Sequence, residues 1–442
     1  MTLRRIACLF FVATIGDTVR GADWPQWMGP GRDDRWNETG IIEAIPAGGL
    51  PVRWRTAIAG GYAGPAIVGG RVFVTDYVRQ SGEAKNDPGA RAELSGVERV
   101  LCLDLATGKQ IWKHEYPRSY KISYPAGPRA TPTVADGKVY ALGAEGNLLC
   151  LDAQLGKVLW QKDLQREYKT EAPIWGFAAH PLVDGNQLIC LAGGAGSAVV
   201  SLNKDTGQEI WRALSSAEIG YCPPSIIEAG GKRQLLVWLP QNLHSLNPAT
   251  GEVYWSQPLM PDYGMSICAP QKEGDYLFAS GIGSVGALFK LQADRPGAEL
   301  VWRGRPNDAV YCANSTPLID NGVIYGADCQ VGCLRAVRLA DGKRLWETFA
   351  PTTGGERRAS SGTAFLTKNG DRYFLFSETG DLVLARLSPE KYEELGRMHL
   401  LDPTGEAFGR PVVWSHPAFA NRSIVVRNDK EIICVSLAKD GK

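Results

Sequence analysis

The sequence lacks an excess of charge of either sign. Lysine and arginine together number 48, aspartate and glutamate number 47, and the formal net charge is +1. Proteins that bind nucleic acids or anionic membrane surfaces usually concentrate positive charge on one face. The charge balance therefore gives no support to a nucleic-acid partner, and it favours a neutral partner or a small local site.

Long hydrophobic runs are also missing. Two arginines precede an apolar run over residues 6–15, which is too short for the roughly 20 apolar residues of a membrane-spanning helix. Small residues follow at Gly21 and Ala22, as at a cleavage site for secretion. We therefore predict a signal peptide over residues 1–21 and a soluble exported protein, periplasmic or secreted, with no transmembrane segment.

Histidine is scarce, and no two histidines have the spacing of paired metal ligands, so we expect no metal site. Nine cysteines follow residue 21, and this odd number leaves at least one thiol unpaired in an oxidising compartment. Cys222, Cys268 and Cys312 recur in successive repeats, which either brings three thiols together or repeats a small residue. Cys329 and Cys333, in "DCQVGC", fit a disulfide, a soft metal site or two packed thiols.

Tryptophan and glycine, by contrast, are plentiful, with 13 and 51 residues. The stretch "LDLATGKQIW" (103–112) returns in "LDAQLGKVLW", "LNKDTGQEIW", "LNPATGEVYW" and "RLADGKRLW". The recurring tryptophans are separated by 44 to 58 residues and are Trp54, Trp112, Trp160, Trp211, Trp255, Trp302 and Trp346. This period, with about four short strands in each unit, is typical of β-propeller blades. The tryptophans are expected on the outer strands, where an indole can cover the gap between neighbouring sheets.

A second series of residues runs in step with the tryptophans. Seven prolines each open a short apolar strand, and they are Pro65, Pro132, Pro181, Pro224, Pro270, Pro317 and Pro417. The segment "SGTAFL" fills the same position without proline, which makes eight units. Proline suits the first position of a strand, where no ladder donor is required.

The two ends of the chain complement each other. The last unit offers three strands, "PAFA", "SIVVR" and "EIICVSL", while "LPVRWRTAI" near the start is a tryptophan strand without partners. We predict an all-β fold: a single eight-bladed β-propeller of four-stranded antiparallel blades over residues 50–442, in which the N-terminal strand closes the last blade. In unit seven "EKYEELGRMHL" replaces the tryptophan strand, so its contact with the next blade must differ. The Trp-rich segment 22–49 either anchors blades or presents aromatics to a partner.

Functional residues are expected on the face that carries the long connections. We interpret Tyr77–Glu98 as an inserted loop of the first blade on this face. Residues just before each inner strand should surround the channel mouth and form a polar, aromatic-walled pocket, or else satisfy strand ends and water. The candidate ligand-binding residues are Arg129, Trp175, His180, Tyr221, Tyr311, Asn314, Arg358, Arg410, Trp414 and His416.

The tryptophan-ended strands resemble the PQQ-like repeats of the quinoprotein β-propeller superfamily. The chain is also similar to exported bacterial PQQ-like repeat proteins, through "DWPQWMGPGRDD" near the start and "WSHPAF" near the end. One branch of the superfamily, BamB-like, implies a non-catalytic propeller that binds partners. We expect such a scaffold, with no cofactor and with a protein, peptide or carbohydrate partner at the channel mouth.

The other branch of the superfamily implies the alternative function. It contains alcohol or sugar dehydrogenases that hold pyrroloquinoline quinone (PQQ) and Ca²⁺ at the channel mouth. Their pattern includes an adjacent cysteine pair, and this sequence has none. Glu171, Asp308 and Asn314 are the residues we considered as calcium ligands.

Overall fold

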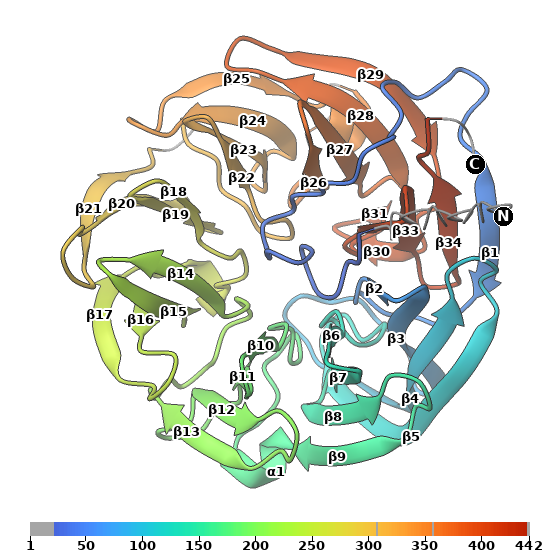
Figure 1. Ribbon diagram of the computed structural model, residues 1–442, viewed down its shortest axis with the longest axis vertical. Helices are drawn as coiled ribbons and strands as arrows, with labels where there is room; N and C mark the ends of the chain where they lie inside the picture. The colour runs from blue at the N-terminus through green and yellow to red at the C-terminus, as the bar shows by residue number, and fades with distance from the viewer. Residues whose placement is uncertain (1–21, 306–307, 356–357, 440–442) are drawn as a thin grey trace, which may run out of the picture.

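The computed structural model describes residues 22–305, 308–355 and 358–439; the predicted signal peptide, residues 1–21, lies outside this part of the chain. Within the described residues, eight four-stranded antiparallel sheets form a ring (Figure 1). The predicted eight-bladed β-propeller is therefore confirmed. Each sheet runs in chain order from an inner strand A to an outer strand D, apart from the last, which takes its outer strand from the N-terminus.

The blades differ mainly in the length of their strands. Blades 1 to 4 consist of β2 (Ala66–Val68), β3 (Arg71–Ser81), β4 (Ala92–Asp104) and β5 (Gln110–Ile122); β6 (Thr133–Ala135), β7 (Lys138–Leu142), β8 (Asn147–Asp152) and β9 (Val158–Asp163); β10 (Leu182–Asp184), β11 (Gln187–Leu191), β12 (Val199–Asn203) and β13 (Glu209–Ala213); and β14 (Ser225–Ala229), β15 (Lys232–Trp238), β16 (Asn242–Leu246) and β17 (Val253–Pro258). Blades 5 to 8 consist of β18 (Gln271–Glu273), β19 (Tyr276–Gly281), β20 (Val285–Leu291) and β21 (Ala298–Arg303); β22 (Leu318–Asp320), β23 (Val323–Asp328), β24 (Cys333–Arg338) and β25 (Arg344–Thr348); β26 (Ala364–Asn369), β27 (Arg372–Ser377), β28 (Asp381–Leu387) and β29 (Tyr392–His399); and β32 (Ala418–Ala420), β33 (Ser423–Arg427), β34 (Glu431–Ser436) and β1 (Val52–Ala57).

Few other elements occur in the described residues. They are α1 (Leu164–Tyr168), a 3₁₀ turn η1 (Asp262–Gly264), α2 (Ala350–Thr353), and a hairpin of β30 (Gly405–Ala407) and β31 (Arg410–Val412) between blades 7 and 8. No helix in this part of the chain is long and apolar enough to cross a membrane.

The two ends of the chain close the ring. β1 pairs antiparallel with β34, with Trp54 opposite Cys434, so blade 8 has the sheet order β1-β34-β33-β32. Figure 1 shows this N-terminal strand on the outside of the C-terminal sheet. Closure gives blade 8 its fourth strand, and it covers the outer edge of β34, which another chain could otherwise join.

The repeated tryptophan and glycine meet across five of the eight seams between blades. The Trp112 indole donates a hydrogen bond to the Ala153 carbonyl of the next blade (3.1 Å). Gly156, in the C-to-D turn of that blade, lies against the same indole, and a Cβ there would stand 2.6 Å from ring carbons of Trp112. The same pairing of indole and turn glycine recurs in Trp54–Gly108, Trp160–Gly207, Trp211–Gly251 and Trp302–Gly342. The motif repeats because each copy completes the seam of its neighbour.

Three seams depart from this pattern. Trp346 donates to the Ser388 carbonyl of blade 7 (2.9 Å), but no turn glycine lies against its indole. Gly297, which lies one residue further from its tryptophan, has Gln292 rather than an indole beside it, and Trp255 donates instead to Gln234 of its own blade (2.8 Å). Blade 7 has no outer-strand tryptophan. There the N-terminal segment takes the place of the indole, because Ile45 lies against Gly396 and bonds to the Leu395 carbonyl (3.3 Å).

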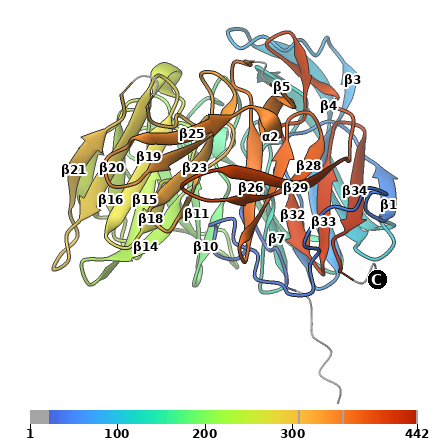
Figure 2. The ribbon, with the colours of Figure 1, turned by 90° about the horizontal axis from the view of Figure 1, so that it is seen from above.

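The insertion in blade 1 is mostly strand, which corrects the interpretation of Tyr77–Glu98 as a loop. β3 continues to Ser81 and β4 begins at Ala92, so the true loop is residues 82–91. The extension was missed because many of its side chains are charged and exposed, and only residues such as Tyr77, stacked on Tyr120 at 3.9 Å, are buried. Figure 2 shows β3, β4 and β5 rising above one face of the ring.

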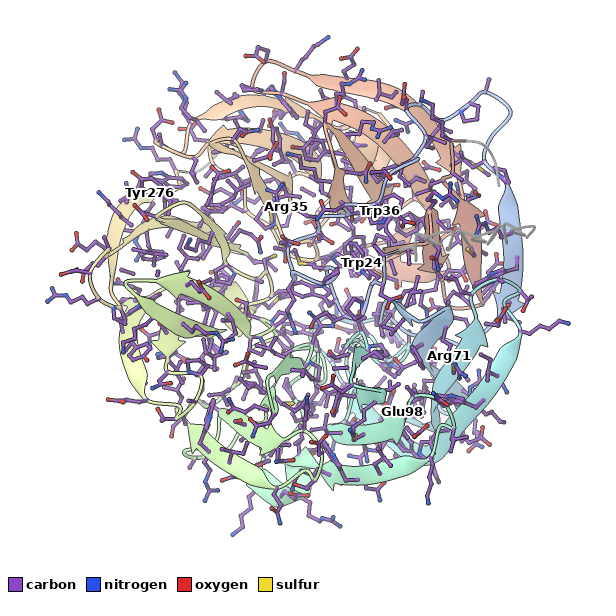
Figure 3. The ribbon with its side chains drawn as sticks, in the orientation of Figure 1. Trp24, Arg35, Trp36, Arg71, Glu98 and Tyr276 are labelled. Carbon is purple, nitrogen blue, oxygen red and sulfur yellow. The ribbon has the colours of Figure 1, made fainter. Side chains whose placement is uncertain are left out.

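The N-terminal segment 22–49 crosses the middle of the ring (Figure 3). Trp24 exchanges backbone hydrogen bonds with Ile67 of blade 1, Arg35 donates to the Ile319 carbonyl of blade 6, and the Trp36 amide donates to Lys368 of blade 7. Trp24 and Trp36 are both 1% exposed. The segment therefore packs across blades as an anchor and fills the end of the channel opposite the blade 1 extension.

Candidate functional site

A cavity of about 890 Å³ opens at the face that carries the D-to-A connections. Its floor consists of Trp27, His180, Phe365 and His416, and we call the whole cavity the cup. The Trp27 indole stacks on the His180 ring with centroids 4.8 Å apart, and it meets His416 edge-on at 5.8 Å. The chain's own N-terminal segment thus closes the channel and supplies the centre of the floor.

Buried hydrogen bonds hold Trp27 in this place. Arg32, five residues later, donates to the carbonyls of His180 and Pro181 (both 3.0 Å), and its guanidinium lies 5.5 Å from the Trp27 ring centroid. Burial lowers the pKa of Arg32 to about 10. Gly29 permits the tight turn between Trp27 and Arg32, because it has a φ of +77° and a Cβ there would stand 2.9 Å from Trp24.

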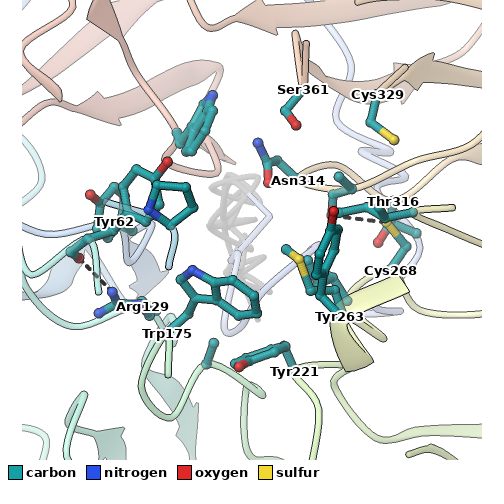
Figure 4. A pocket seen from close by; sticks show the side chains of 18 of the residues that line it. Tyr62, Arg129, Trp175, Tyr221, Tyr263, Cys268, Asn314, Thr316, Cys329 and Ser361 are labelled. Atoms are coloured by element: carbon teal, nitrogen blue, oxygen red, sulfur yellow. Dashed lines mark hydrogen bonds between the residues drawn. The ribbon is translucent and has the colours of Figure 1, made fainter. Parts of the chain in front are cut away.

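Aromatic side chains form one wall of the cup. Trp175 and Tyr221 meet edge to face at 5.5 Å, and Trp414 lies 6.1 Å from Tyr124. Figure 4 shows Tyr62, Trp175 and Tyr221 along this side of the cavity. All five residues come from connections that precede inner strands, where the backbone is free to turn its side chains toward the axis.

The opposite wall carries small polar and sulfur-containing side chains. Asn314, Thr316, Cys268, Cys329 and Ser361 lie along it in Figure 4. They come from the connections before blades 5, 6 and 7 and from the β23–β24 turn. Tyr263 lies on this side as well, so this wall is polar only in part, whereas the facing wall is mainly aromatic.

Little charge faces the cavity. The Arg129 guanidinium donates to the backbone carbonyls of Gly127, Ser123 and Tyr124 and lies 5.2 Å from the centroid of Tyr62. Among the lining residues Glu218 is the one carboxylate, and it is exposed.

The two histidines of the floor are neutral. Burial lowers the pKa of His416 to about 3, and burial together with nearby Arg32 holds the pKa of His180 well below its ordinary value. The His180 Nδ1 accepts a hydrogen bond from the Thr131 amide (2.7 Å). The floor is therefore uncharged at neutral pH.

The structure brings seven of the ten candidate ligand-binding residues to the cup. They are Arg129, Trp175, His180, Tyr221, Asn314, Trp414 and His416. Arg410 stands behind the wall, where it bonds to Glu378, which also accepts from the Trp414 indole (3.1 Å). Tyr311 is fully buried, with its hydroxyl on the Arg305 carbonyl, and Arg358 is exposed and does not line the cup.

Sequence reasoning did not nominate several lining aromatics. These are Trp27, Tyr62, Tyr124, Tyr263, Phe365 and Phe408. The sequence carried only part of the signal: Trp27 belongs to the "DWPQWMGPGRDD" segment, and Tyr124 lies in the connection before the inner strand β6. Counting back from each proline cannot find them, because their approach to the axis depends on the path of each connection.

The cysteines form no bridge among the described residues, where all nine are free and buried. Cys329 faces the cup and Cys333 donates to Glu347, so the disulfide considered for this pair is not formed here. Cys222 donates to the Cys268 carbonyl of the next blade (3.4 Å), and burial raises its pKa to about 12. The repeated thiols thus act as small spacers between blades.

No group of three or more potential ligands in this part of the chain is arranged to hold a metal ion.

The closed ring and the cup at its axis define a β-propeller protein with a plugged central channel. The chain belongs to the family described as outer membrane protein assembly factor BamB, whose model matches residues 96–348 and 241–442. No curated protein matches the chain by sequence.

Several solved structures share the fold. BamB from Moraxella catarrhalis is 14% identical with a TM-score of 0.55, and the match covers 87% of this chain and 98% of that one. The quinohemoprotein alcohol dehydrogenase from Comamonas testosteroni is 13% identical with a TM-score of 0.58, covering 94% and 80%. A europium-containing methanol dehydrogenase is 12% identical with a TM-score of 0.59, covering 94% and 89%. At these identities the likeness concerns the fold alone.

Proposed function

We propose that the protein is an exported, non-catalytic propeller scaffold that binds a protein, peptide or carbohydrate partner at the cup. The observation that carries this proposal is the cup itself, with an aromatic wall and a floor that the chain builds from its own N-terminal segment. Concave sites with aromatic walls and a few polar groups are the usual places for ligands. Membership of the BamB family and the signal-like residues 1–21 support export.

The titratable groups at the cup favour binding over catalysis. His180 accepts a backbone hydrogen bond through Nδ1 and stays neutral, and burial raises the pKa of the Cys329 thiol to about 12. A general base or a thiolate nucleophile needs a pKa much closer to the working pH. These side chains therefore suit contact with a ligand better than proton or group transfer.

The cup does not fit PQQ with Ca²⁺. Calcium takes six to eight oxygen ligands, whereas the lining contains one carboxylate, Glu218. Of the calcium ligands considered, Asn314 lines the cup, but Glu171 and Asp308 are exposed and outside it. PQQ carries several carboxylates, and the one cation in the lining, Arg129, is already bonded to three backbone carbonyls.

Photo-cross-linking in an exporting bacterium tests the proposal. A benzophenone side chain at Phe408, on the rim of the cup, should form an adduct with the partner, because this residue is 52% exposed and lines the mouth. The matched control is the same group at Tyr276, which lies on the outside of blade 5 (Figure 3) and does not line the cup. Equal adducts at both positions, or none at Phe408, would contradict the proposal.

Turnover of an alcohol or sugar by the purified protein with PQQ and Ca²⁺ would establish the enzyme alternative instead.

A further inference from the structure

The two unlike walls of the cup match the two surfaces of a sugar ring. Trp175 and Tyr221 present aromatic faces and edges on one side, and Asn314, Thr316 and Ser361 present polar groups beside Tyr263 on the other (Figure 4). Trp414, 6.1 Å from Tyr124, belongs to the aromatic lining. A pyranose has an apolar face of C–H groups and a rim of hydroxyl groups. Stacking on an indole uses the first, and hydrogen bonds to amide and hydroxyl groups use the second.

Several polar atoms at the cup have no partner among the described residues. They are the Thr131 hydroxyl, the Tyr221 hydroxyl, the Asn314 amide nitrogen and the His416 Nδ1. Thr131, Tyr221 and His416 are 2%, 4% and 9% exposed, so they are more than nine-tenths buried. A buried polar group without a hydrogen bond costs about 1–3 kcal/mol. Hydroxyl groups are both donors and acceptors, so they match a hydroxyl, an amide N–H and an imidazole nitrogen alike, and these groups favour a ligand rich in hydroxyls.

The geometry disfavours charged ligands and extended peptides. The floor histidines are neutral and Arg129 is committed to backbone carbonyls, so no free cation awaits an anionic ligand, and the one carboxylate of the lining, Glu218, is exposed to solvent. Peptides commonly add a strand to an open sheet edge. Here the N-terminal segment already pairs with Ile67 and Lys368 on the inner strands and closes the channel to a threading chain.

We infer that the partner bound in the cup is a short neutral oligosaccharide, held with its sugar faces against Trp175 and Trp414 and its hydroxyls toward Tyr221 and Asn314. This inference rests on the proposed function, since it names the ligand class of the same cup. The volume of about 890 Å³ lies in the upper part of the usual range for small-molecule sites, which suits a few sugar units rather than one.

An array of neutral glycans, anionic glycans and capped peptides, followed by calorimetry on the best binder, tests the inference with the full mature chain. Neutral glycans should bind, and Trp175→Ala and Trp414→Ala should each weaken binding at least about 10-fold. Tyr221→Phe removes only a hydroxyl and should weaken binding about 2- to 10-fold, in line with one lost hydrogen bond. Tyr276→Ala, outside the cup, should bind as the wild type, and thermal unfolding should show that each variant is folded.

The outcomes separate this inference from the proposed function. Peptides that bind in place of neutral glycans, with the same sensitivity to Trp175→Ala, overturn the sugar but leave the cup as the binding site. Glycan binding that survives both tryptophan substitutions places the sugar elsewhere and overturns the inference. If no neutral glycan binds, the inference is also overturned, and the rim cross-link at Phe408 then decides separately whether the cup binds a partner at all.

Discussion

Single glycines set the distance between neighbouring blades. Gly156 adopts a φ of +69° and leaves room for the Trp112 indole, whereas Gly137, with a φ of +73°, has nothing within 4 Å of a Cβ. Both positions carry the backbone strain of a left-handed residue, about 1–2 kcal/mol for an L side chain. The two glycines thus separate the effect of conformation from the effect of close packing.

We predict that Gly156→Ala destabilises the protein by about 1–3 kcal/mol more than Gly137→Ala, because the new methyl group overlaps the indole. Urea unfolding of both variants, followed by tryptophan fluorescence, measures the difference. If the two alanine variants lose the same stability, the seam does not depend on the contact between glycine and indole.

A buried histidine makes stability sensitive to acid. The folded-state pKa of His416 is about 3, well below the ordinary value of 6.5, because burial disfavours the charged ring. Below pH 6.5 the unfolded chain binds a proton that the folded chain does not. The stabilisation is therefore present above pH 6.5 and is lost as the pH falls toward 3, at up to about 1.4 kcal/mol per pH unit for each such group.

His416→Gln should make the fall in unfolding free energy between pH 6.5 and 4.5 shallower. His399→Gln is the control, because His399 is half exposed and its bonds to Asp381 and Asp402 outweigh burial and raise its pKa. Denaturant unfolding at several pH values distinguishes the two variants. An acid slope that His416→Gln leaves unchanged would show that this ring is not a source of the sensitivity.

The β30–β31 hairpin illustrates how an added element shapes the site. Its tip residue Phe408 lies beside Trp414, with ring centroids 6.4 Å apart, and the hairpin is fastened by Arg410 to the buried carboxylate of Glu378. The same carboxylate accepts from the Trp414 indole. One acceptor on blade 7 therefore positions both the hairpin and a tryptophan of the cup wall.

Glu378→Ala should loosen this hairpin, since the Arg410 guanidinium and the Trp414 indole both lose their acceptor. Limited chymotrypsin digestion should then cut after Phe408 several-fold faster than in the wild type. Glu406→Ala is the matched control, because Glu406 is an exposed glutamate on the same hairpin and its side chain does not bond to Arg410 or Trp414. Equal cleavage rates in the two variants would show that Glu378 does not fasten the hairpin.

Two parts of the N-terminal region serve the whole molecule in different ways. Residues 22–36 plug the channel and build the cup floor, whereas β1 completes blade 8 and covers the outer edge of β34. Loss of the plug opens the channel but leaves every blade with four strands. Loss of β1 exposes a row of unpaired backbone groups, which invites pairing with another chain.

We predict that deletion of residues 22–36 lowers the melting temperature but leaves the number of chains per particle in solution equal to that of the full mature chain. Deletion of residues 22–57 should in addition cause self-association. Light scattering coupled to size-exclusion chromatography, with thermal unfolding, compares the two. If the 22–57 deletion has the same number of chains per particle and the same melting temperature as the 22–36 deletion, closure by β1 is dispensable.

Periodic features of the chain were readable without coordinates. The seven tryptophans, the prolines before the inner strands and the unmatched strands at the two ends were sufficient to predict eight blades and their closure. The face of the cup and seven of its residues followed, because a residue before an inner strand must lie near the axis. Inferences of this kind succeed because equivalent positions of a repeat occupy equivalent places in the ring.

Other features depend on contacts between segments with no shared period. The placement of Trp27 between His180 and His416 joins residues more than 150 positions apart, and it requires Arg32 to reach the backbone of blade 3. Tyr311 occupies a slot that looks equivalent in the chain, yet it turns into the seam rather than the cup. The repeats were enough to specify the ring, because local hairpins and alternating apolar residues are encoded nearby. The floor and walls of the cup came from packing across the ring, which no single stretch of the chain encodes.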